Sequence, residues 1–497
     1  MTTLVVVLEP ANQVLEYLYL VFETQLRALL HVQDTMGDQP PDLQGQVWLQ
    51  LLDFEGNSAF LEEVGVTTVT FYRGNCRDGS AIIREWLSSM LRANPWLAGQ
   101  LVFKKGALHL VYPNATDDIK VVDSVWQSPE KCTLSPRMPY TDLVRTLKGL
   151  KDVVAGSGRS VIRSKSPVCR CTVFPAPSDG SDGFAVVFSI AHQVADGFTY
   201  YKILSQLKGA AAFHGIKQAG PEQVTDRTLK SLDAERDHAA EALNDKAIPE
   251  MKWVLSCGVM CGVLGTIMCY ACCRKHKPAV AYYIDEDAIS ARKKQAIRVN
   301  DARTDQSVAY VSTNDILTSH FGRTLGLDVV LMPVNLRGRV PGGAAADKAG
   351  NYEGVFVIDE ASFSNAVDIR RALLDGPPIV RAGYSQSQVM PALPGCCQSC
   401  CSTKFGMITS WSSFFDGDLS LGDGDAQASQ GSCFEQQLHV PLYDPQGLDG
   451  EFPLGVVFRP LPGKIAVLYL GLSLTGTSPE ELRDPSDGQP SPLGPSV

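Results

Sequence analysis

One histidine stands out as a residue that could move protons. His192 follows an almost continuous apolar run, Gly183–Ile190 (GFAVVFSI), and Asp196 and Gly197 come four and five positions after it. A neutral imidazole is the usual base for taking a proton from a hydroxyl, amine or thiol near neutral pH. A nearby carboxylate or backbone carbonyl would fix its orientation, and Gly197 would permit a sharp turn into a following helix. The alternative is an inert, hydrogen-bonded core histidine at a strand end.

The elements around this histidine are typical of an α/β chain. The apolar run suits a strand buried on both faces, and Phe198–Leu207 has helical spacing. In α/β proteins, catalytic and binding residues commonly lie at the end of a buried strand, just before a helix. Upstream, Val66 begins a strand rich in β-branched and aromatic residues (VTTVTFY). A helix is predicted over Ser80–Arg92, with Ser80 as its N-cap and one apolar face formed by Ile83, Trp86, Leu87 and Met90.

The second half of the chain echoes this order of strand, helix and strand. A helix is predicted over Ile316–Thr324, with its cap in Ser312–Asp315. Strands are predicted over Asp328–Asn335, Ile408–Phe415 and Ile465–Leu474. Each half therefore places polar residues at the end of a strand.

Several phrases, in this order, resemble the BAHD family of acyl-CoA-dependent acyltransferases. They are FSIAHQVADGFTYYKIL with its HxxxDG motif, VSTNDILTSHFGRTL, VNLRGRV, NYEG and ITSW. The preceding FYRGNCRDGSAIIREWLSSMLRANPWLAGQL is similar to the family's first-lobe stretch. The similarity covers about residues 64–475, and Ala191 before the histidine favours the single-histidine branch. Where the family has DFGWG, this chain has Phe415-Asp416-Gly417-Asp418.

The resemblance implies an α/β (α+β) fold of two chloramphenicol acetyltransferase-like lobes. Each lobe would be a mixed β-sheet flanked by helices, with the active site in the channel between them. The regions we expect are an N-terminal extension (1–62), an N-terminal acyltransferase lobe with HxxxDG (63–245), an apolar linker or membrane-associated segment (246–280), a C-terminal acyltransferase lobe (281–477) and a disordered tail (478–497).

The same resemblance implies residue roles. His192 would deprotonate a hydroxyl or amine, which attacks the thioester of acyl-CoA without a covalent acyl-enzyme. Thr409 and Trp411 match the positions that stabilise the oxyanion, although a strand tryptophan is more often a core residue. Asp196 would point away from the acceptor and form a structural ion pair with Arg337 of the second lobe. On residue type alone, Arg337 is more often a solvated or loop-capping residue.

Composition excludes several classes of protein. The 497 residues contain 44 Lys and Arg against 54 Asp and Glu, a net charge of −10, so the basic footprint of a nucleic-acid binder is missing. A mean hydropathy near zero excludes a polytopic membrane protein. The start of the chain has no basic region and no cleavage site of a signal peptide, and 14 Cys are too few for a disulfide scaffold. We therefore expect a reducing, cytoplasmic setting.

One segment, Trp253–Cys273, carries no charge over 21 residues and is followed by Arg274–Lys277. Its length would span a bilayer, but a span would put His192 and Trp411 on opposite sides of the membrane. We therefore expect an enzyme associated with the membrane surface through 253–273, with candidate palmitoylation sites at Cys269, Cys272 and Cys273. The alternative is a buried helix that links the lobes.

The sequence thus predicts an acyltransferase for groups other than aminoacyl groups, acting as a monomer. Its co-substrate would be acyl-CoA, with no further cofactor, and its acceptor a small-molecule or lipid alcohol or amine. Cys396–Cys401 (CCQSCC) lacks a common zinc-ligand spacing, so no metal is expected. Two alternatives stay open: a condensation-type domain that takes its acyl group from a carrier protein, and a catalytically inactive, membrane-associated binding protein on the same fold.

Overall fold

The computed structural model describes residues 46–51, 55–56, 60–104, 106–113, 119–129, 131–148, 150, 152–177, 183–207, 280–301, 308–335, 337, 349–375, 404–421, 434–442 and 453–470. The apolar segment 253–273, the cysteine run 396–401 and the tail after 477 lie outside these residues. Within the described ranges, no helix combines the length and the apolar character that crossing a bilayer requires.

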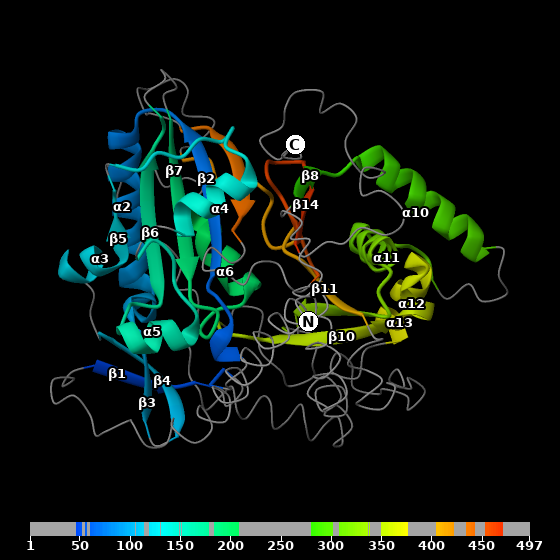
Figure 1. Ribbon diagram of the computed structural model, residues 1–497, viewed down its shortest axis with the longest axis horizontal. Helices are drawn as coiled ribbons and strands as arrows, with labels where there is room; N and C mark the ends of the chain where they lie inside the picture. Colours follow the sequence, from blue (N-terminus) through cyan, green and yellow to red (C-terminus); the bar gives the residue numbers. More distant parts are fainter. Residues whose placement is uncertain are drawn as a thin grey trace, which may run out of the picture.

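The first lobe is built on a sheet whose described strands run in the order β12-β2-β7-β6-β5 (Figure 1). β5 and β6 are parallel, and the other neighbours pair antiparallel. The strands are β2 (Val66–Arg73), β5 (Trp126–Gln127), β6 (Cys169–Pro175), β7 (Gly183–Ile190) and β12 (Gln436–Pro441). Helices and 3-10 turns around it are η1 (Phe60–Glu62), α2 (Cys76–Ala93), η2 (Pro95–Ala98), α3 (Ile119–Val125), α4 (Tyr140–Lys148), α5 (Gly158–Ser164), α6 (Gly197–Leu204) and η3 (Ser205–Leu207).

The second lobe is built on a sheet of order β10-β9-β11-β13-β14-β8 among the described strands. β9, β11 and β13 are parallel to one another, and the outer neighbours are antiparallel. The strands are β8 (Val280–Tyr283), β9 (Val329–Asn335), β10 (Glu353–Asp359), β11 (Phe405–Ser410), β13 (Leu454–Phe458) and β14 (Ala466–Leu470). The helices are α10 (Glu286–Asp301), α11 (Thr313–Leu325), α12 (Glu360–Phe363) and α13 (Ala366–Asp375), which lie on the outer side of this sheet (Figure 1).

A small third sheet, of order β1-β4-β3, lies below the first lobe in Figure 1. It contains β1 (Gln46–Gln50), β3 (Gln100–Lys104) and β4 (Ala107–Pro113), and Gly106 makes the β3–β4 turn at a φ of 80°. Residues 46–50, which the sequence placed in an N-terminal extension, pair along their whole length with β4.

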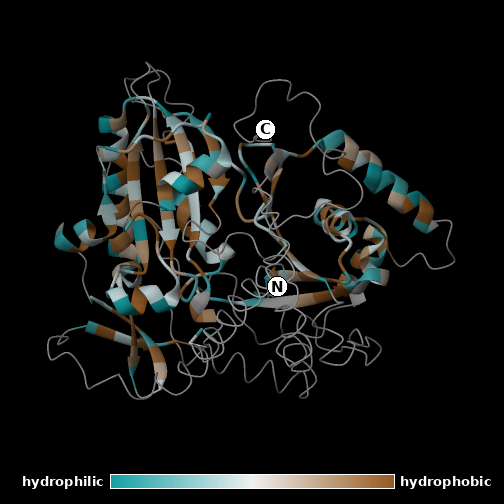
Figure 2. Ribbon diagram, viewed as in Figure 1, coloured by the Kyte–Doolittle hydropathy of each residue, from teal (hydrophilic) through white to brown (hydrophobic). Residues whose placement is uncertain are grey.

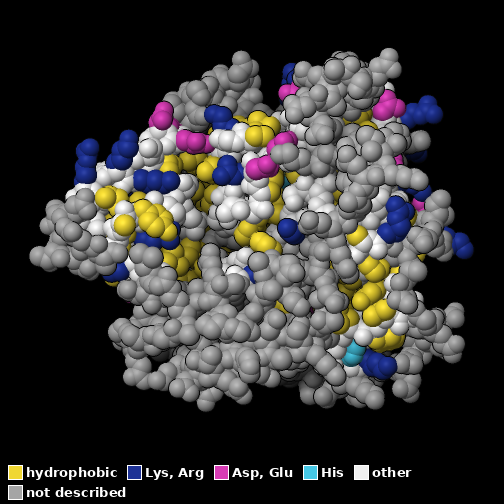
Figure 3. All heavy atoms as spheres, turned by 180° about the vertical axis from the view of Figure 1, so that it is seen from behind, with side chains coloured by type: hydrophobic (Ala, Val, Ile, Leu, Met, Phe, Trp, Pro, Cys, Tyr) yellow, Lys and Arg dark blue, Asp and Glu magenta, His cyan; other side chains and the backbone are white. Residues whose placement is uncertain are grey.

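Apolar side chains hold the two lobes together. One cluster packs α2 and α6 on the first sheet, and a second packs α11 and α13 on the second sheet. A third cluster joins the sheets to each other, because Val69 and Val187 of the first share it with Val456 and Leu468 of the second. Figure 2 shows the strands largely brown while the outer helices carry both colours. On the reverse face, the described Lys and Arg side chains are interspersed with Asp and Glu (Figure 3).

Two local predictions are wrong. Ser80 is not the N-cap of α2: Asn75, after a turn at Gly74 (φ 125°), accepts hydrogen bonds from the amides of Arg77 and Asp78, so the helix begins earlier. The predicted apolar face of this helix is nevertheless buried, at Ile83, Trp86, Leu87 and Met90. The strand predicted to reach Phe415 ends at Ser410, because the amide of Phe414 turns back to the carbonyl of Trp411 at 3.1 Å. The cap predicted in Ser312–Asp315 is confirmed: Ser312 Oγ accepts from the amide of Asp315, and the carboxylate of Asp315 accepts from the amide of Ser312.

Candidate active site

The segment from Ala191 to Asp196 carries His192 from the end of β7 to the start of α6. Two tight turns shape it, since the amide of Val194 bonds to the carbonyl of Ala191 (3.1 Å) and that of Ala195 to His192 (3.4 Å). Asp196 is the N-cap of α6, and its Oδ1 accepts from the amide of Thr199 at 2.8 Å. The buried strand therefore delivers an imidazole and a carboxylate onto one short loop.

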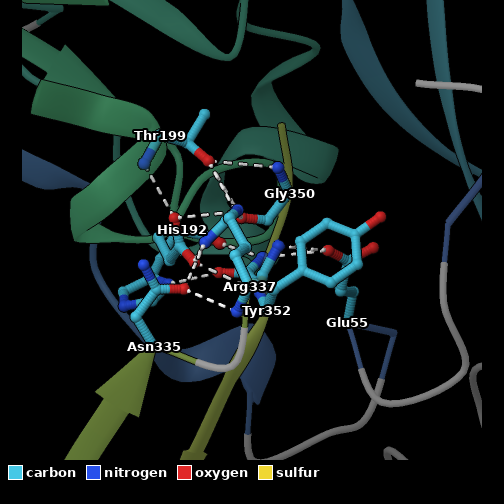
Figure 4. A network of polar contacts seen from close by, with 9 residues as sticks. Glu55, His192, Thr199, Asn335, Arg337, Gly350 and Tyr352 are labelled. Atoms are coloured by element: carbon cyan, nitrogen blue, oxygen red, sulfur yellow. Dashed lines mark hydrogen bonds and ion pairs between the residues drawn. The ribbon is translucent and has the colours of Figure 1, made fainter. Parts of the chain in front are cut away.

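Asp196 and Arg337 form the ion pair predicted from the sequence. Arg337 Nη1 lies 2.6 Å from Asp196 Oδ2 and Nη2 lies 3.3 Å from Oδ1, with both side chains buried. The guanidinium also donates to Thr199 Oγ1 (3.0 Å) and to the carbonyl of Gly350 (2.8 Å), and the amide of Tyr352 donates to Asp196 (Figure 4). A buried pair is stable only when such further bonds satisfy it, so this cluster fixes the second lobe against α6.

Gly197 has a different role from the turn that the sequence suggested. Its φ is not positive, so the backbone there needs no glycine. A Cβ at Gly197 would instead lie 3.0 Å from Nε1 of Trp411 and 3.2 Å from Phe414. The missing side chain thus allows the N–H edge of the Trp411 indole to lie directly on the N-terminus of α6.

His192 is held from the second lobe by an amide that the sequence did not identify. Its Nδ1 lies 3.2 Å from Oδ1 of Asn351, whose Nδ2 donates to the backbone oxygen of His192 at 2.8 Å. Asn351 also donates to Glu55 Oε1, through Nδ2 at 2.9 Å and through its backbone amide at 3.3 Å. Both Glu55 and Asn351 are 0% exposed. On another side, the ring of Phe60 contacts the imidazole edge-on at 5.2 Å between centroids.

Three carboxylates influence the charge of His192. Burial opposes a charged imidazole, but the carboxylates of Glu353, Glu63 and Asp196 outweigh it, and the pKa of His192 is raised above its ordinary value. Burial raises the pKa of Glu353, while the imidazole of His192 acts in the opposite direction. Proton occupancy of the ring therefore depends on groups from both lobes.

A cavity of about 830 Å³ opens beside this loop. Its walls include Gly197, Glu353, Thr409 and Trp411, so both residues predicted to stabilise an oxyanion face the same space. His192 is not itself among the lining residues of this cavity; Glu353 is the lining group that acts on it most strongly. At other places the wall carries the cationic side chains of Lys293, Arg370 and Arg459.

The segment that replaces the expected DFGWG phrase packs against the first lobe. The ring of Phe415 stacks on Tyr201 of α6, with centroids 4.6 Å apart and planes at 12°. Gly417 adopts a φ of 94°, and a Cβ there would lie 2.7 Å from the carbonyl of Leu461. The hydroxyl of Tyr72 donates to the carbonyl of Leu419 at 2.9 Å. This segment of the second half of the chain therefore contacts the first lobe through Phe415 and Leu419.

In the described part of the chain, no three His, Cys, Asp or Glu side chains lie close enough together to hold a metal ion. The neighbours of His192 that sequence reasoning missed are Asn351, Glu353, Glu55 and Glu63. The first two lie in the phrase NYEG, which signalled them only through its resemblance. Glu55 lies in a stretch with no motif, so no sequence signal pointed to it.

Solved structures match this architecture, whereas neither a protein-family model nor a curated protein sequence matches the chain. TRI101 of F. graminearum, in complex with ethyl coenzyme A, gives a TM-score of 0.52 at 12% identity, over 85% of this chain and 94% of that one. The first condensation domain of the CDA synthetase gives 0.53 at 12% identity, over 88% and 93%. Polyketide synthase associated protein 5 from Mycobacterium tuberculosis gives 0.50 at 13% identity, over 88% and 95%. The chain therefore has the two-lobed fold of the chloramphenicol acetyltransferase-like acyltransferases and condensation domains, as the resemblance implied.

Proposed function

We propose that this protein transfers an acyl group from acyl-CoA to a hydroxyl or amine of a small-molecule acceptor, with His192 as general base. The observation that carries the proposal is the state of the imidazole. Nδ1 is bonded to Asn351, while Nε2 has no hydrogen-bond partner in the described part of the chain. An imidazole with one nitrogen fixed and the other free is the arrangement that general-base catalysis needs.

In the proposed reaction, Nε2 of His192 takes the proton of the acceptor as the acceptor oxygen or nitrogen attacks the thioester carbonyl. The tetrahedral intermediate then expels the CoA thiolate, which takes the proton from the imidazolium and leaves as the free thiol. No bond forms between protein and acyl group. General-base catalysis of this kind contributes about 10²–10⁴-fold to the rate.

The negative oxygen of the intermediate needs a donor. Trp411 and Thr409 are the candidates, because both face the cavity beside Gly197. An indole N–H can only donate, so it discriminates in favour of an oxyanion, and removing such a donor typically costs about 10²–10³-fold in kcat. Asp196 and Arg337 are not assigned a proton-transfer role, since each satisfies the other in a buried pair.

Two cationic side chains on the cavity wall support a nucleotide-bearing donor. Lys293 bonds to Thr313 at 2.8 Å and Arg459 to the carbonyl of Ser412 at 2.6 Å, so both cations are held on the wall. CoA carries phosphates that need such partners. Acyl-CoA is therefore favoured over a carrier-bound acyl group, which brings no adenosine phosphates.

The test measures thiol release from medium-chain acyl-CoA donors in the presence of candidate alcohols and amines. His192→Ala should abolish turnover while the thermal unfolding midpoint stays near that of the unmodified protein. His109→Ala is the matched control, because His109 lies on β4 and bonds only locally to the carbonyl of Ala107. Full turnover by His192→Ala would remove this histidine as the base.

A condensation-type reaction is the second candidate, since a condensation domain is among the structural neighbours. The same assay separates the two, with the acyl group offered once on CoA and once on a carrier protein. Tight CoA binding without any product, measured by calorimetry, would instead indicate a binding protein on this fold.

Association with a membrane surface through residues 253–273 is proposed on sequence grounds, from the uncharged stretch and the basic residues behind it. Replacing Cys269, Cys272 and Cys273 with Ser should release the protein from the membrane fraction if acylation contributes. If the substituted and the unmodified protein partition equally between membrane and soluble fractions, acylation of these cysteines does not contribute to membrane association.

A further inference from the structure

A second cavity lies in the outer helical layer of the second lobe, between α10, α11 and the start of α13. These helices lie close together on the right of Figure 1. The volume of this outer cavity is about 440 Å³, which is within the range of small-molecule sites. Among the described residues, none lines both the outer cavity and the cavity beside Gly197. The proposed acyl transfer does not use the outer cavity, so the two are separate sites.

The wall of the outer cavity is cationic. Arg292 of α10 and Arg323 of α11 line it, and none of its described lining residues is an Asp or a Glu. Nε of Arg323 donates to the carbonyl of Ser319 at 3.4 Å, while its two Nη groups have no partner in the described part of the chain. α13 begins at Ala366, which also lines the cavity, so the positive end of that helix adds to the same charge. The outer cavity therefore favours an anion.

One buried hydroxyl also indicates a ligand. Ser319 is only 4% exposed and lines the outer cavity, yet its Oγ bonds to none of the residues that the structure describes. A serine inside a helix commonly bonds back to a carbonyl one turn earlier, and buried polar groups nearly always have a partner. A hydroxyl at a cavity wall without a partner from the protein is available to donate to an oxygen of a bound molecule.

Apolar side chains contribute the rest of the surface. Ile316 of α11 and Val299 of α10 line the outer cavity, and Val299 is 49% exposed. Basic and hydrophobic side chains adjoin on the left of the reverse face, where α10 lies (Figure 3). The outer cavity therefore combines two cations, a hydroxyl donor and an apolar surface.

We propose that the outer cavity is a binding site for a small organic phosphate. The phosphate group would bind Arg292, Arg323 and the hydroxyl of Ser319, and its carbon skeleton would contact Ile316 and Val299. A phosphomonoester carries about −1.5 to −2 charges near neutral pH, which matches two guanidinium groups, and it offers three oxygens to their planar donors. A carboxylate brings a single charge and therefore matches this wall less well.

Isothermal titration calorimetry with phenyl phosphate tests the ligand class. Three further probes each lack one feature: inorganic phosphate lacks the apolar part, benzoate lacks the second charge, and benzyl alcohol lacks any charge. We expect phenyl phosphate to bind most tightly and benzyl alcohol to give no heat of binding. No binding of phenyl phosphate, or equal affinity for benzoate, would overturn the proposal.

Three substitutions test the location. Arg323→Gln should weaken phenyl phosphate binding about 10–100-fold, because hydrogen bonds to a charged group are lost, and Ser319→Ala about 2–10-fold. Gln295→Glu keeps the shape of an exposed side chain on the cavity wall and adds a negative charge there, so it should also weaken binding. Unchanged affinity in all three variants would overturn the proposal.

Two arginines provide matched controls. Arg92→Gln removes an exposed charge at the end of α2, where Arg92 donates to Ser89, and should leave phenyl phosphate binding unchanged. Arg459→Gln removes a cation from the wall of the cavity beside Gly197 and should keep the binding event that Arg323→Gln weakens. If Arg459→Gln abolishes binding and Arg323→Gln does not, the phosphate binds in the cavity beside Gly197 and the proposal fails. Because these measurements need no turnover, their outcome is independent of the proposed acyl transfer.

Discussion

Two histidines lie near the meeting of the lobes and are held in opposite ways. His439, on β12, is fully buried, and both ring nitrogens are taken, Nδ1 by Thr70 (2.8 Å) and Nε2 by Tyr201 (3.0 Å). Burial without a compensating carboxylate lowers its pKa to about 3. His192 is partly exposed, uses one nitrogen, and has its pKa raised by carboxylates against the effect of burial.

The difference shows what keeps a buried imidazole able to exchange protons. Burial alone makes the charged form inaccessible, so His439 stays neutral and serves as a hydrogen-bonded spacer between a threonine and a tyrosine. Carboxylates around His192 restore access to the charged form that a base must adopt during turnover. Substitutions of single residues around His192 and His439 test this difference.

The largest effect on kcat should come from replacing His192, and replacing His439 provides the comparison. His192→Gln removes the proposed base and should lower kcat by about 10²–10⁴-fold. His439→Gln keeps hydrogen-bonding groups beside Thr70 and Tyr201 and should leave kcat within a few-fold, while the unfolding midpoint falls. Steady-state kinetics and denaturation curves on both variants provide the measurement. A similar loss of kcat in both variants would contradict the claim that the two histidines differ in function.

The next effect concerns Asp196, which forms a direct buried ion pair with Arg337. Arg337→Ala leaves a buried carboxylate unpaired and should destabilise the protein by about 3–5 kcal/mol. Arg145→Ala, which breaks an exposed pair with Asp142, should cost about 1 kcal/mol or less. Urea unfolding followed by fluorescence compares them. Equal costs would contradict the assignment of Asp196 as the structural carboxylate of the loop.

Trp411→Phe should have a smaller and purely kinetic effect. The ring contact with Tyr201 (5.8 Å between centroids) is largely kept, but the N–H is lost. We expect kcat to fall by about 10²-fold with KM nearly unchanged, since the donor acts on charge that develops in the transition state. If kcat is unchanged in Trp411→Phe but falls in Thr409→Val, the hydroxyl of Thr409, and not the indole of Trp411, is the donor to the oxyanion.

Glu353→Gln should give the smallest change, a displacement of the pH–rate profile. The carboxylate stabilises the imidazolium and raises the pKa of His192, so its removal should lower that pKa. His192 would then lose its proton at lower pH, and the acid limb of kcat/KM should move to lower pH. Glu435→Gln, at an exposed pair with Arg73, is the control and should leave the profile in place. A shift to higher pH would contradict the carboxylate's role.

Much of the fold could be predicted because its strands are strongly apolar. β7 and α6 are close to their predicted bounds, and the cap at Ser312 is where the pattern placed it. Strands β6 and β12 were missed because cysteines, a proline and polar residues interrupt their apolar character. The partner of β12 is β2, which lies far away in the sequence, so no local pattern records that pairing.

The site was predicted as far as its residues follow motifs. His192 and the Asp196–Arg337 pair came from HxxxDG and VNLRGRV, and the structure brings that pair together. The residues that raise the pKa of His192 or hold its ring come from other parts of the chain: Glu63 and Glu353 act on the pKa, and Asn351, itself bonded to Glu55, contacts the ring. Their contribution is a matter of distance and burial, which depends on the assembled lobes rather than on spacing along the chain.

The crossing of β12 has a mechanical consequence. This strand leaves the second half of the chain and completes the sheet of the first, with an antiparallel register from Gln436–Tyr72 to Pro441–Thr68. The chain therefore passes between the two sheets on both sides of β12, from β11 into it and from it to β13. Together with the apolar cluster that the sheets share, these two crossings couple the lobes, so the molecule should melt in one cooperative step.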